Sequence, residues 1–171
     1  CDGLITDEPG VALCCFGADC TTILLFDPVT GALGGMGVEI CREFARNGAN
    51  VVLLDLDEEK VKAAAADLAA EFGIHAEGYK MNATDEAEVQ AAVAATIANF
   101  GRVDVLVNTA GILRFAAMED LPLSDWEQVL NVNLTGYFIT SQRFGREMIK
   151  AGQGRPVAFY LEKSVSAFAA M

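Results

Sequence analysis

The sequence predicts an α/β fold, a doubly wound parallel sheet with helices on both faces. Short apolar runs typical of buried strands alternate with helical patterns along most of the chain, and glycines stand where those helices should end. A glycine-rich turn also follows an apolar run and opens an amphipathic segment. With 171 residues, 53% of them hydrophobic and 21% charged, the chain is expected to form one globular domain.

The first strand has two candidates, the apolar runs at residues 11–16 and 23–26. Pro28 follows the second run closely, and proline is uncommon in a central strand because it cannot donate a hydrogen bond to the ladder. Joining residues 10–13 to 29–31 would give a smoother strand and turn. We therefore suspect that residues 14–28 are an insertion or an aberrant stretch, within an irregular N-terminal part at 1–28.

From Gly37 onward the signals alternate cleanly between helices and strands. The expected elements are a helix that ends at Gly48, a strand over 50–54, a helix over 57–72 before Gly73, a strand over 74–81, a helix over 84–100 before Gly101 and an apolar strand over 103–107. A capping box of Ser124 and Glu127 is expected to open a long helix that stops at Gly152. Residues 156–161 are a candidate last strand.

Charge and cysteine usage exclude several classes of partner. Twelve basic and 24 acidic residues give a formal charge of −12, which disfavours binding to nucleic acid or to an anionic membrane. No apolar run reaches the roughly 18 residues of a membrane span, and no secretory signal is visible, so we expect a cytoplasmic protein. The five cysteines lack paired C-x-x-C spacing, so we expect reduced thiols and no metal site.

The glycine-rich turn runs from Thr30 to Gly37 and includes Gly31 and Gly35. Glycines let the backbone turn sharply and approach a ligand, and the helix that follows offers unpaired N–H groups and a positive dipole end. These features fit the pyrophosphate of a dinucleotide. The alternative is an ordinary glycine-rich turn between a strand and a helix.

Asp55 ends the second expected strand, 18 positions after Gly37, close to the roughly 20 expected for an acid that binds the adenosine ribose. A 2′-phosphate beside this carboxylate would be repelled, and the next residue is Leu56 rather than an arginine. This pair of residues favours NAD, with NADP less likely. The alternative is a solvated acid at the end of a strand.

Asn108, Thr109, Ala110 and Gly111 directly follow the strand over 103–107. With the glycine-rich turn, they make residues 29–171 resemble the short-chain dehydrogenase/reductase family, whose T-G-x-x-x-G-x-G pattern lies at 30–37 and whose N-N-A-G lies at 108–111 with threonine second. The resemblance implies a Rossmann-like sheet and NAD held by Thr30, Gly31, Leu33, Gly35, Met36, Gly37, Asp55, Leu56, Asn82, Ala83, Asn108, Ala110 and Gly111. Asn82 stands where the family usually has an aspartate against adenine.

The resemblance implies two catalytic residues in this sequence. Asn133 would hold a water in a proton relay, and Ser164 would polarise the substrate carbonyl or alcohol, with Ser166 as the alternative serine. Read without the family, Asn133 would be a helix-interior asparagine that bonds a backbone carbonyl. The stretch at 157–163 departs from the family's usual strand before the serine.

The family's general acid/base tyrosine, with a lysine four positions later, is absent because only seven residues follow Ser164. Tyr160 and Lys163 precede the serine and are three positions apart, so we do not assign them that role. We expect an NAD-dependent oxidoreductase of an alcohol or ketone, C-terminally truncated, with its sheet incomplete at that edge and inactive as this chain. The full-length family implies a homo-oligomer. The alternatives are a nucleotide-binding module without catalysis and a non-functional truncated product.

Overall fold

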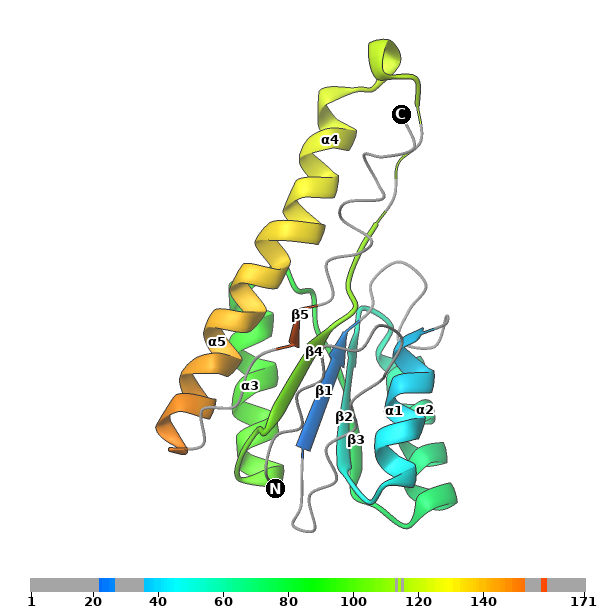
Figure 1. The fold of residues 1–171 in the computed structure, drawn as a ribbon, viewed down its shortest axis with the longest axis vertical. Helices are drawn as coiled ribbons and strands as arrows, with labels where there is room; N and C mark the ends of the chain where they lie inside the picture. Colours follow the sequence, from blue (N-terminus) through cyan, green and yellow to red (C-terminus); the bar gives the residue numbers. More distant parts are fainter. Residues whose placement is uncertain (1–21, 27–35, 113, 115, 153–157, 160–171) are drawn as a thin grey trace, which may run out of the picture.

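The computed structural model describes residues 22–26, 36–112, 114, 116–152 and 158–159. Strands and helices alternate along this part of the chain (Figure 1). Its elements are β1 (Thr22–Phe26), α1 (Met36–Arg46), β2 (Asn50–Asp55), α2 (Glu58–Phe72), β3 (Ala76–Lys80), α3 (Glu86–Phe100), β4 (Val105–Asn108), η1 (Met118–Asp120), α4 (Leu123–Leu130), η2 (Asn131–Gly136), α5 (Tyr137–Lys150) and β5 (Ala158–Phe159).

The described strands form one parallel sheet in the order β3-β2-β1-β4-β5. Helices α1 and α2 cover one face of the sheet, and α3 and α5 cover the other (Figure 1). Parallel strands joined by helices give this arrangement because each crossover carries the chain over a face of the sheet. The predicted doubly wound α/β fold is therefore confirmed.

The central strand β1 comes from the second of the two candidate runs. Leu24 in β1 pairs with Val52 in β2 and with Leu106 in β4, so β1 is bonded on both sides. The suspicion that residues 14–28 are an insertion is therefore wrong for Thr22–Phe26. The competing run at 11–16 lies outside the described residues. Two neighbouring strands of matching register decide the choice, and this long-range pairing is not visible in the local sequence.

Strand β2 has both of its faces in the core. Val51 and Leu53 pack with α1 and α2, whereas Val52 and Leu54 pack with α3 and α5. All four side chains are buried. A strand covered by helices on both faces needs a continuous apolar run rather than an alternating one, which is the pattern that predicted this strand.

The predicted helix ends are confirmed at four glycines with positive φ, namely Gly48, Gly73, Gly101 and Gly152. At the end of α2, Gly73 has φ 68°, and its N–H bonds to the carbonyl of Ala69. This left-handed conformation favours glycine because it has no Cβ. At the other end of α2, the Asp57 side chain accepts a hydrogen bond from the backbone N–H of Lys60.

The long predicted helix is present as α4, η2 and α5 in direct succession, with η2 in π-helical geometry. Its predicted capping box is wrong. Pro122 is the N-cap, and its carbonyl accepts from the N–H groups of Asp125 and Trp126, so Ser124 lies inside the first turn. Proline fixes φ near the value a helix start requires, and this sets the boundary earlier than Ser124.

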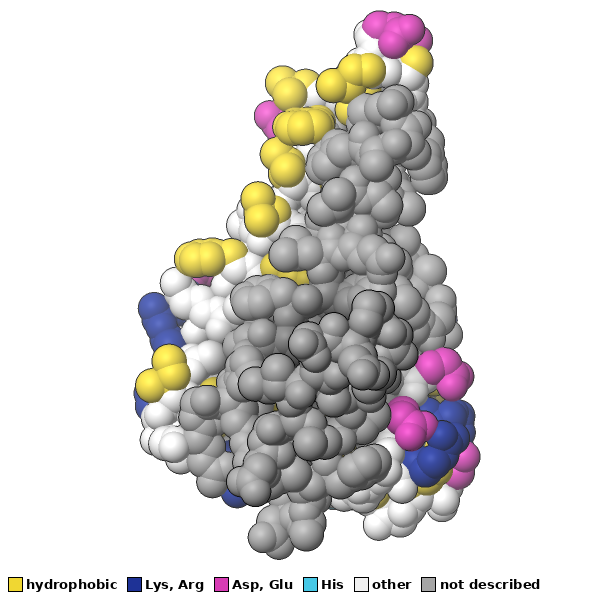
Figure 2. Space-filling view, viewed as in Figure 1, with side chains coloured by type: hydrophobic (Ala, Val, Ile, Leu, Met, Phe, Trp, Pro, Cys, Tyr) yellow, Lys and Arg dark blue, Asp and Glu magenta, His cyan; other side chains and the backbone are white. Residues whose placement is uncertain are grey.

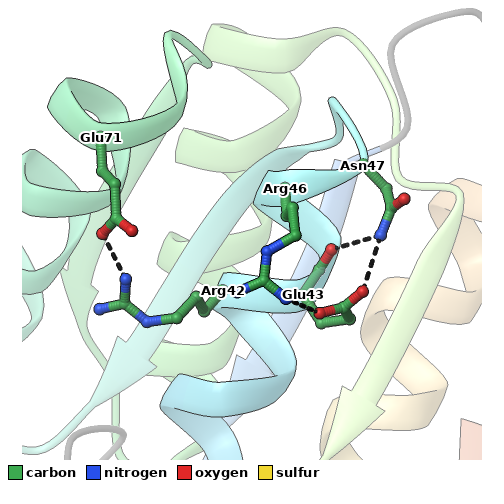
Figure 3. Close-up of polar contacts among 5 residues, drawn as sticks. All are labelled: Arg42, Glu43, Arg46, Asn47 and Glu71. Carbon is green, nitrogen blue, oxygen red and sulfur yellow. Dashed lines mark hydrogen bonds and ion pairs between the residues drawn. The ribbon is translucent and has the colours of Figure 1, made fainter.

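Helices α1 and α2 are joined by surface polar contacts (Figure 3). Arg42 of α1 pairs with Glu71 of α2, and its guanidinium lies 5.9 Å from the ring centroid of Phe72. Asn47 donates to the carbonyl of Glu43 at 2.7 Å near the end of α1. Within the described residues, no helix is long and apolar enough to cross a membrane.

Candidate functional site

The candidate site lies at the carboxyl edge of the sheet, where three chemistry-bearing strand ends meet. Phe26 at the end of β1 is in register with Leu54 on one side and Asn108 on the other. On the far side of β2, the N–H of Met81 donates to the carbonyl of Asp55 at 2.8 Å. In a doubly wound sheet, ligands bind at this edge where the strand order reverses, which here is between β1 and β4.

The glycine-rich turn falls mostly outside the described residues. Thr30, Gly31, Leu33 and Gly35 lie there, and nothing in the structure tests their predicted contacts with a cofactor. Met36 is the first residue of α1, and Gly37 is buried in its first turn. Helix α1 connects β1 to β2, so its N-terminus lies at the carboxyl edge of the sheet. This end carries the partial positive charge that the sequence analysis assigned to pyrophosphate binding.

Asp55 is only 4% exposed, so the alternative of a solvated acid is wrong. Its Oδ1 accepts a hydrogen bond from the N–H of Asp57 at 3.1 Å, at the turn into α2. The neighbouring Leu56 is exposed. The arrangement places a carboxylate at the tip of β2 with an apolar side chain next to it, as the ribose prediction requires.

The loop after β3 is fixed by its own side chains. Oδ1 of Asn82 lies 3.0 Å from the N–H nitrogen and 2.9 Å from the hydroxyl of Thr84, and both donate to it. The N–H of Asn82 donates to Glu88 in α3 at 2.8 Å. Ala83 is buried, and a Cβ built on Gly136 in η2 would lie 3.2 Å from it. Helices α3 and η2 therefore hold this loop at the carboxyl edge.

Asn108 is tied to α5 by three residues on one helix face. The hydroxyl of Tyr137 donates to the Asn108 carbonyl at 2.9 Å, and Nδ2 of Asn108 donates to the hydroxyl oxygen of Ser141 at 3.2 Å. The Thr140 hydroxyl lies 3.0 Å from Oδ1 of Asn108 and 2.9 Å from the carbonyl of Gly136. These contacts fix the end of β4 against the helix that covers it.

Asn133 binds the backbone of the loop after β4. Its Oδ1 accepts from the N–H of Ile112 at 2.8 Å, and its Nδ2 donates to the carbonyl of Ile112 at 3.0 Å. The bland expectation, a bond within its own helix, is therefore wrong. Thr109, Ala110 and Gly111 are buried between Asn108 and this clamp. The proton relay assigned to Asn133 stays a prediction.

The remaining predicted catalytic residues are not placed. Ser164, its alternative Ser166, and the dismissed pair Tyr160 and Lys163 all lie outside the described residues. In the part of the chain that is described, no three His, Cys, Asp or Glu side chains gather as metal ligands would.

Sequence reasoning missed the residues that support the site. Tyr137, Thr140 and Ser141 are spaced i, i+3 and i+4, so a polar stripe on one side of the long helix was available as a signal. Ile112 and Gly136 act through backbone contacts and offered no such signal. These supporting contacts join segments far apart in the sequence.

The family model described as short chain dehydrogenase matches residues 28–160. The D-threitol dehydrogenase of Mycolicibacterium smegmatis is 44% identical over 126 residues, which are 74% of this chain and 48% of that protein. The chain belongs to the short-chain dehydrogenase/reductase family. It spans about half the length of the curated relatives it matches.

Solved structures agree with this assignment. The structure of an NAD⁺-bound xylitol dehydrogenase has a TM-score of 0.72 and 32% identity, over 79% of this chain and 50% of that one. A gluconate 5-dehydrogenase from Burkholderia cenocepacia, in complex with NADP and tartrate, has a TM-score of 0.72 and 34% identity, over 80% and 52%. Nicotinamide cofactors of both kinds therefore occur among the similar structures.

A second family model, described as multi-copper polyphenol oxidoreductase laccase, matches residues 1–37. This match covers the stretch that the sequence analysis singled out as irregular, and only residues 22–26, 36 and 37 of it are described. It includes β1, which lies before the start of the short-chain dehydrogenase match at residue 28. The match is too short to assign the chain to that family.

Proposed function

We propose that this chain binds the adenosine and pyrophosphate part of NAD at the carboxyl edge of its sheet. The observation that carries the proposal is the position of Asp55, a buried carboxylate at the tip of β2 in a sheet whose order reverses beside β1. Family membership supports it, and the N-terminus of α1 at the same edge supplies the charge that a pyrophosphate needs.

The preference for NAD over NADP rests on Asp55 and Leu56. Repulsion between the Asp55 carboxylate and a 2′-phosphate is on the order of 4 kcal/mol at 4 Å with a surface-like dielectric. The next side chain, Leu56, is exposed and carries no charge that could offset it. Since both cofactors occur in similar structures, this local charge is what supports the choice.

We extend the proposal to the whole protein as an oxidoreductase that interconverts an alcohol and a ketone of small size. The printed names of its relatives, dehydrogenases of threitol, xylitol and gluconate, support this class of substrate. Asn133 and Ser164 are the proposed catalytic residues in this chain. The sequence has no tyrosine followed four positions later by a lysine, so the chain alone is proposed not to turn over. A cytoplasmic location and a homo-oligomer complete the proposal.

Calorimetric titration of the chain with NAD, NADP and ADP-ribose tests the binding proposal. NAD and ADP-ribose should bind, and NADP should bind at least about tenfold more weakly, equivalent to about 1.4 kcal/mol. The variant Asp55→Asn should narrow the gap between NAD and NADP because it removes the like charge. Asp67→Asn, which changes an exposed aspartate on α2, is the matched control and should leave the gap intact.

No heat with any of the three ligands, from a sample with a cooperative melt, would overturn the proposal. Equal affinity for NAD and NADP would overturn the cofactor preference alone. If the chain binds ADP-ribose as tightly as NAD, the contacts are confined to the adenosine and pyrophosphate part. That outcome is the one expected of a nucleotide-binding module without catalysis.

A further inference from the structure

The outer side of the long helix carries large apolar side chains that no described residue covers. Leu134, Phe138 and Ile149 are 58%, 61% and 74% exposed. Their spacings of four and eleven residues, close to one and three helical turns, place them along one side. Figure 2 shows hydrophobic side chains following α4 and α5 down this side of the molecule. A contiguous exposed apolar face of this kind marks an interaction surface.

Gly145 makes a hollow in the same face. A Cβ built on it would meet no heavy atom within 4 Å, so the space above it is open. It lies seven residues after Phe138, about two helical turns along the same side, and four residues before Ile149. The face therefore has a protruding aromatic ring and a recess of complementary kind, separated by two turns.

We propose that this face binds a second copy of the same chain, helix against helix and antiparallel. A two-fold axis between Ser141 and Gln142 places Phe138 over the partner's Gly145, and Leu134 against the partner's Ile149. Each copy then supplies one ring and one recess, as an isologous interface requires. Glycine at the contact lets the two backbones approach closely enough for the ring to be buried.

The charges along the helix favour this orientation. Residues 118–130 carry four acidic side chains and no basic one, whereas residues 137–150 carry three basic side chains and one acid. Figure 2 shows the acidic side chains near the α4 end and basic ones near the α5 end. An antiparallel partner brings ends of opposite charge together, while a parallel one would bring like charges together. This complementarity argues for a second copy as the occupant.

The proposal goes beyond the proposed function and is independent of cofactor binding. Sedimentation velocity of the chain across a wide range of concentration tests it directly. The expected result is a shift from the mass of one chain to that of two as concentration rises. A sample that keeps the mass of one chain throughout overturns the proposal, and the face is then left for another segment or protein.

Two variants test the register. Gly145→Phe fills the recess where the isolated chain has open space, so it should leave the fold intact and weaken self-association at least about tenfold. Combining it with Phe138→Gly exchanges ring and recess and should restore the association. Ala63→Phe, at an exposed position on α2, is the matched control and should leave the mass unchanged. Failure of the exchange to restore association overturns the antiparallel register, with circular dichroism confirming that the helix is kept.

Discussion

The amide of Asn133 forms two hydrogen bonds with the backbone of Ile112, one with its N–H at 2.8 Å and one with its carbonyl at 3.0 Å. Asn133 is 2% exposed and lies in η2, the π-helical stretch between α4 and α5. Ile112 follows the buried segment Thr109, Ala110 and Gly111 at the end of β4. A single side chain therefore joins the long helix to the loop that borders the candidate cofactor site.

Replacing Asn133 by alanine should lower the free energy of unfolding by about 1–3 kcal/mol. The substitution leaves the N–H and the carbonyl of Ile112 without their partner, and an unpaired buried polar group costs that amount. Asn131→Ala is the matched control, since Asn131 is an exposed asparagine in the same η2 stretch. Urea unfolding followed by circular dichroism measures both variants, and equal stabilities of the two would contradict the clamp.

Gly78 in β3 should tolerate no side chain. A Cβ built there would lie 2.4 Å from the backbone carbonyl carbon and oxygen of Val61, closer than atoms can pack, so α2 would have to move away from the sheet. Gly78→Ala should destabilise the chain by about 1–3 kcal/mol through overpacking. Gly145→Ala, at a helix position with open space, should instead be neutral or stabilise by up to about 1 kcal/mol. Thermal or urea melts that rank the two variants in the opposite order would contradict this packing.

Thr140→Val should weaken the attachment of β4 to α5. The substitution keeps the shape of the side chain and removes the hydroxyl that lies 3.0 Å from Oδ1 of Asn108. The expected loss of stability is about 1–2 kcal/mol because the side chain is buried and the hydrogen bond is lost. Thr135→Val, at an exposed threonine in η2, should change stability little. The same urea melts measure this pair, and a loss shared equally by both variants would argue against a specific bond to Asn108.

Much of the fold is readable from local sequence because its signals are local. Asn50 to Leu54 form a run that can only be buried on both faces, and glycines with positive φ mark the ends of α1, α2 and α3. Asp55 was found by its distance from the glycine-rich turn. These features depend on a residue and its near neighbours, so sequence reasoning can reach them.

The parts that sequence reasoning missed depend on contacts between distant segments. The choice of Thr22–Phe26 as β1 is made by pairing with β2 and β4, whereas the two apolar runs look alike locally. The start of α4 is set by Pro122 rather than by Ser124, although both fit a helix N-terminus. The π-helical stretch that carries Asn133 interrupts no apolar period, so its bond to Ile112 could not be foreseen.

Stability should fall at alkaline pH because of Cys41, which is buried in α1. Burial raises the pKa of the Cys41 thiol far above its ordinary value. The folded chain keeps the proton while the unfolded chain releases it above about pH 8.5, so the unfolded state binds fewer protons there. The contribution is fully present below that pH and is lost as pH rises, with a slope of up to about 1.4 kcal/mol per pH unit.

Urea melts in reductant between about pH 7.5 and 9.5, below the ordinary pKa of tyrosine, isolate this effect. Cys41→Ala should be less stable at neutral pH because it leaves a small cavity, but its stability should fall less steeply across this range. Tyr79→Phe is the control, since burial also raises the pKa of the Tyr79 phenol, which titrates at higher pH. Parallel pH profiles of the parent chain and Cys41→Ala would show that the buried thiol does not set the alkaline limit.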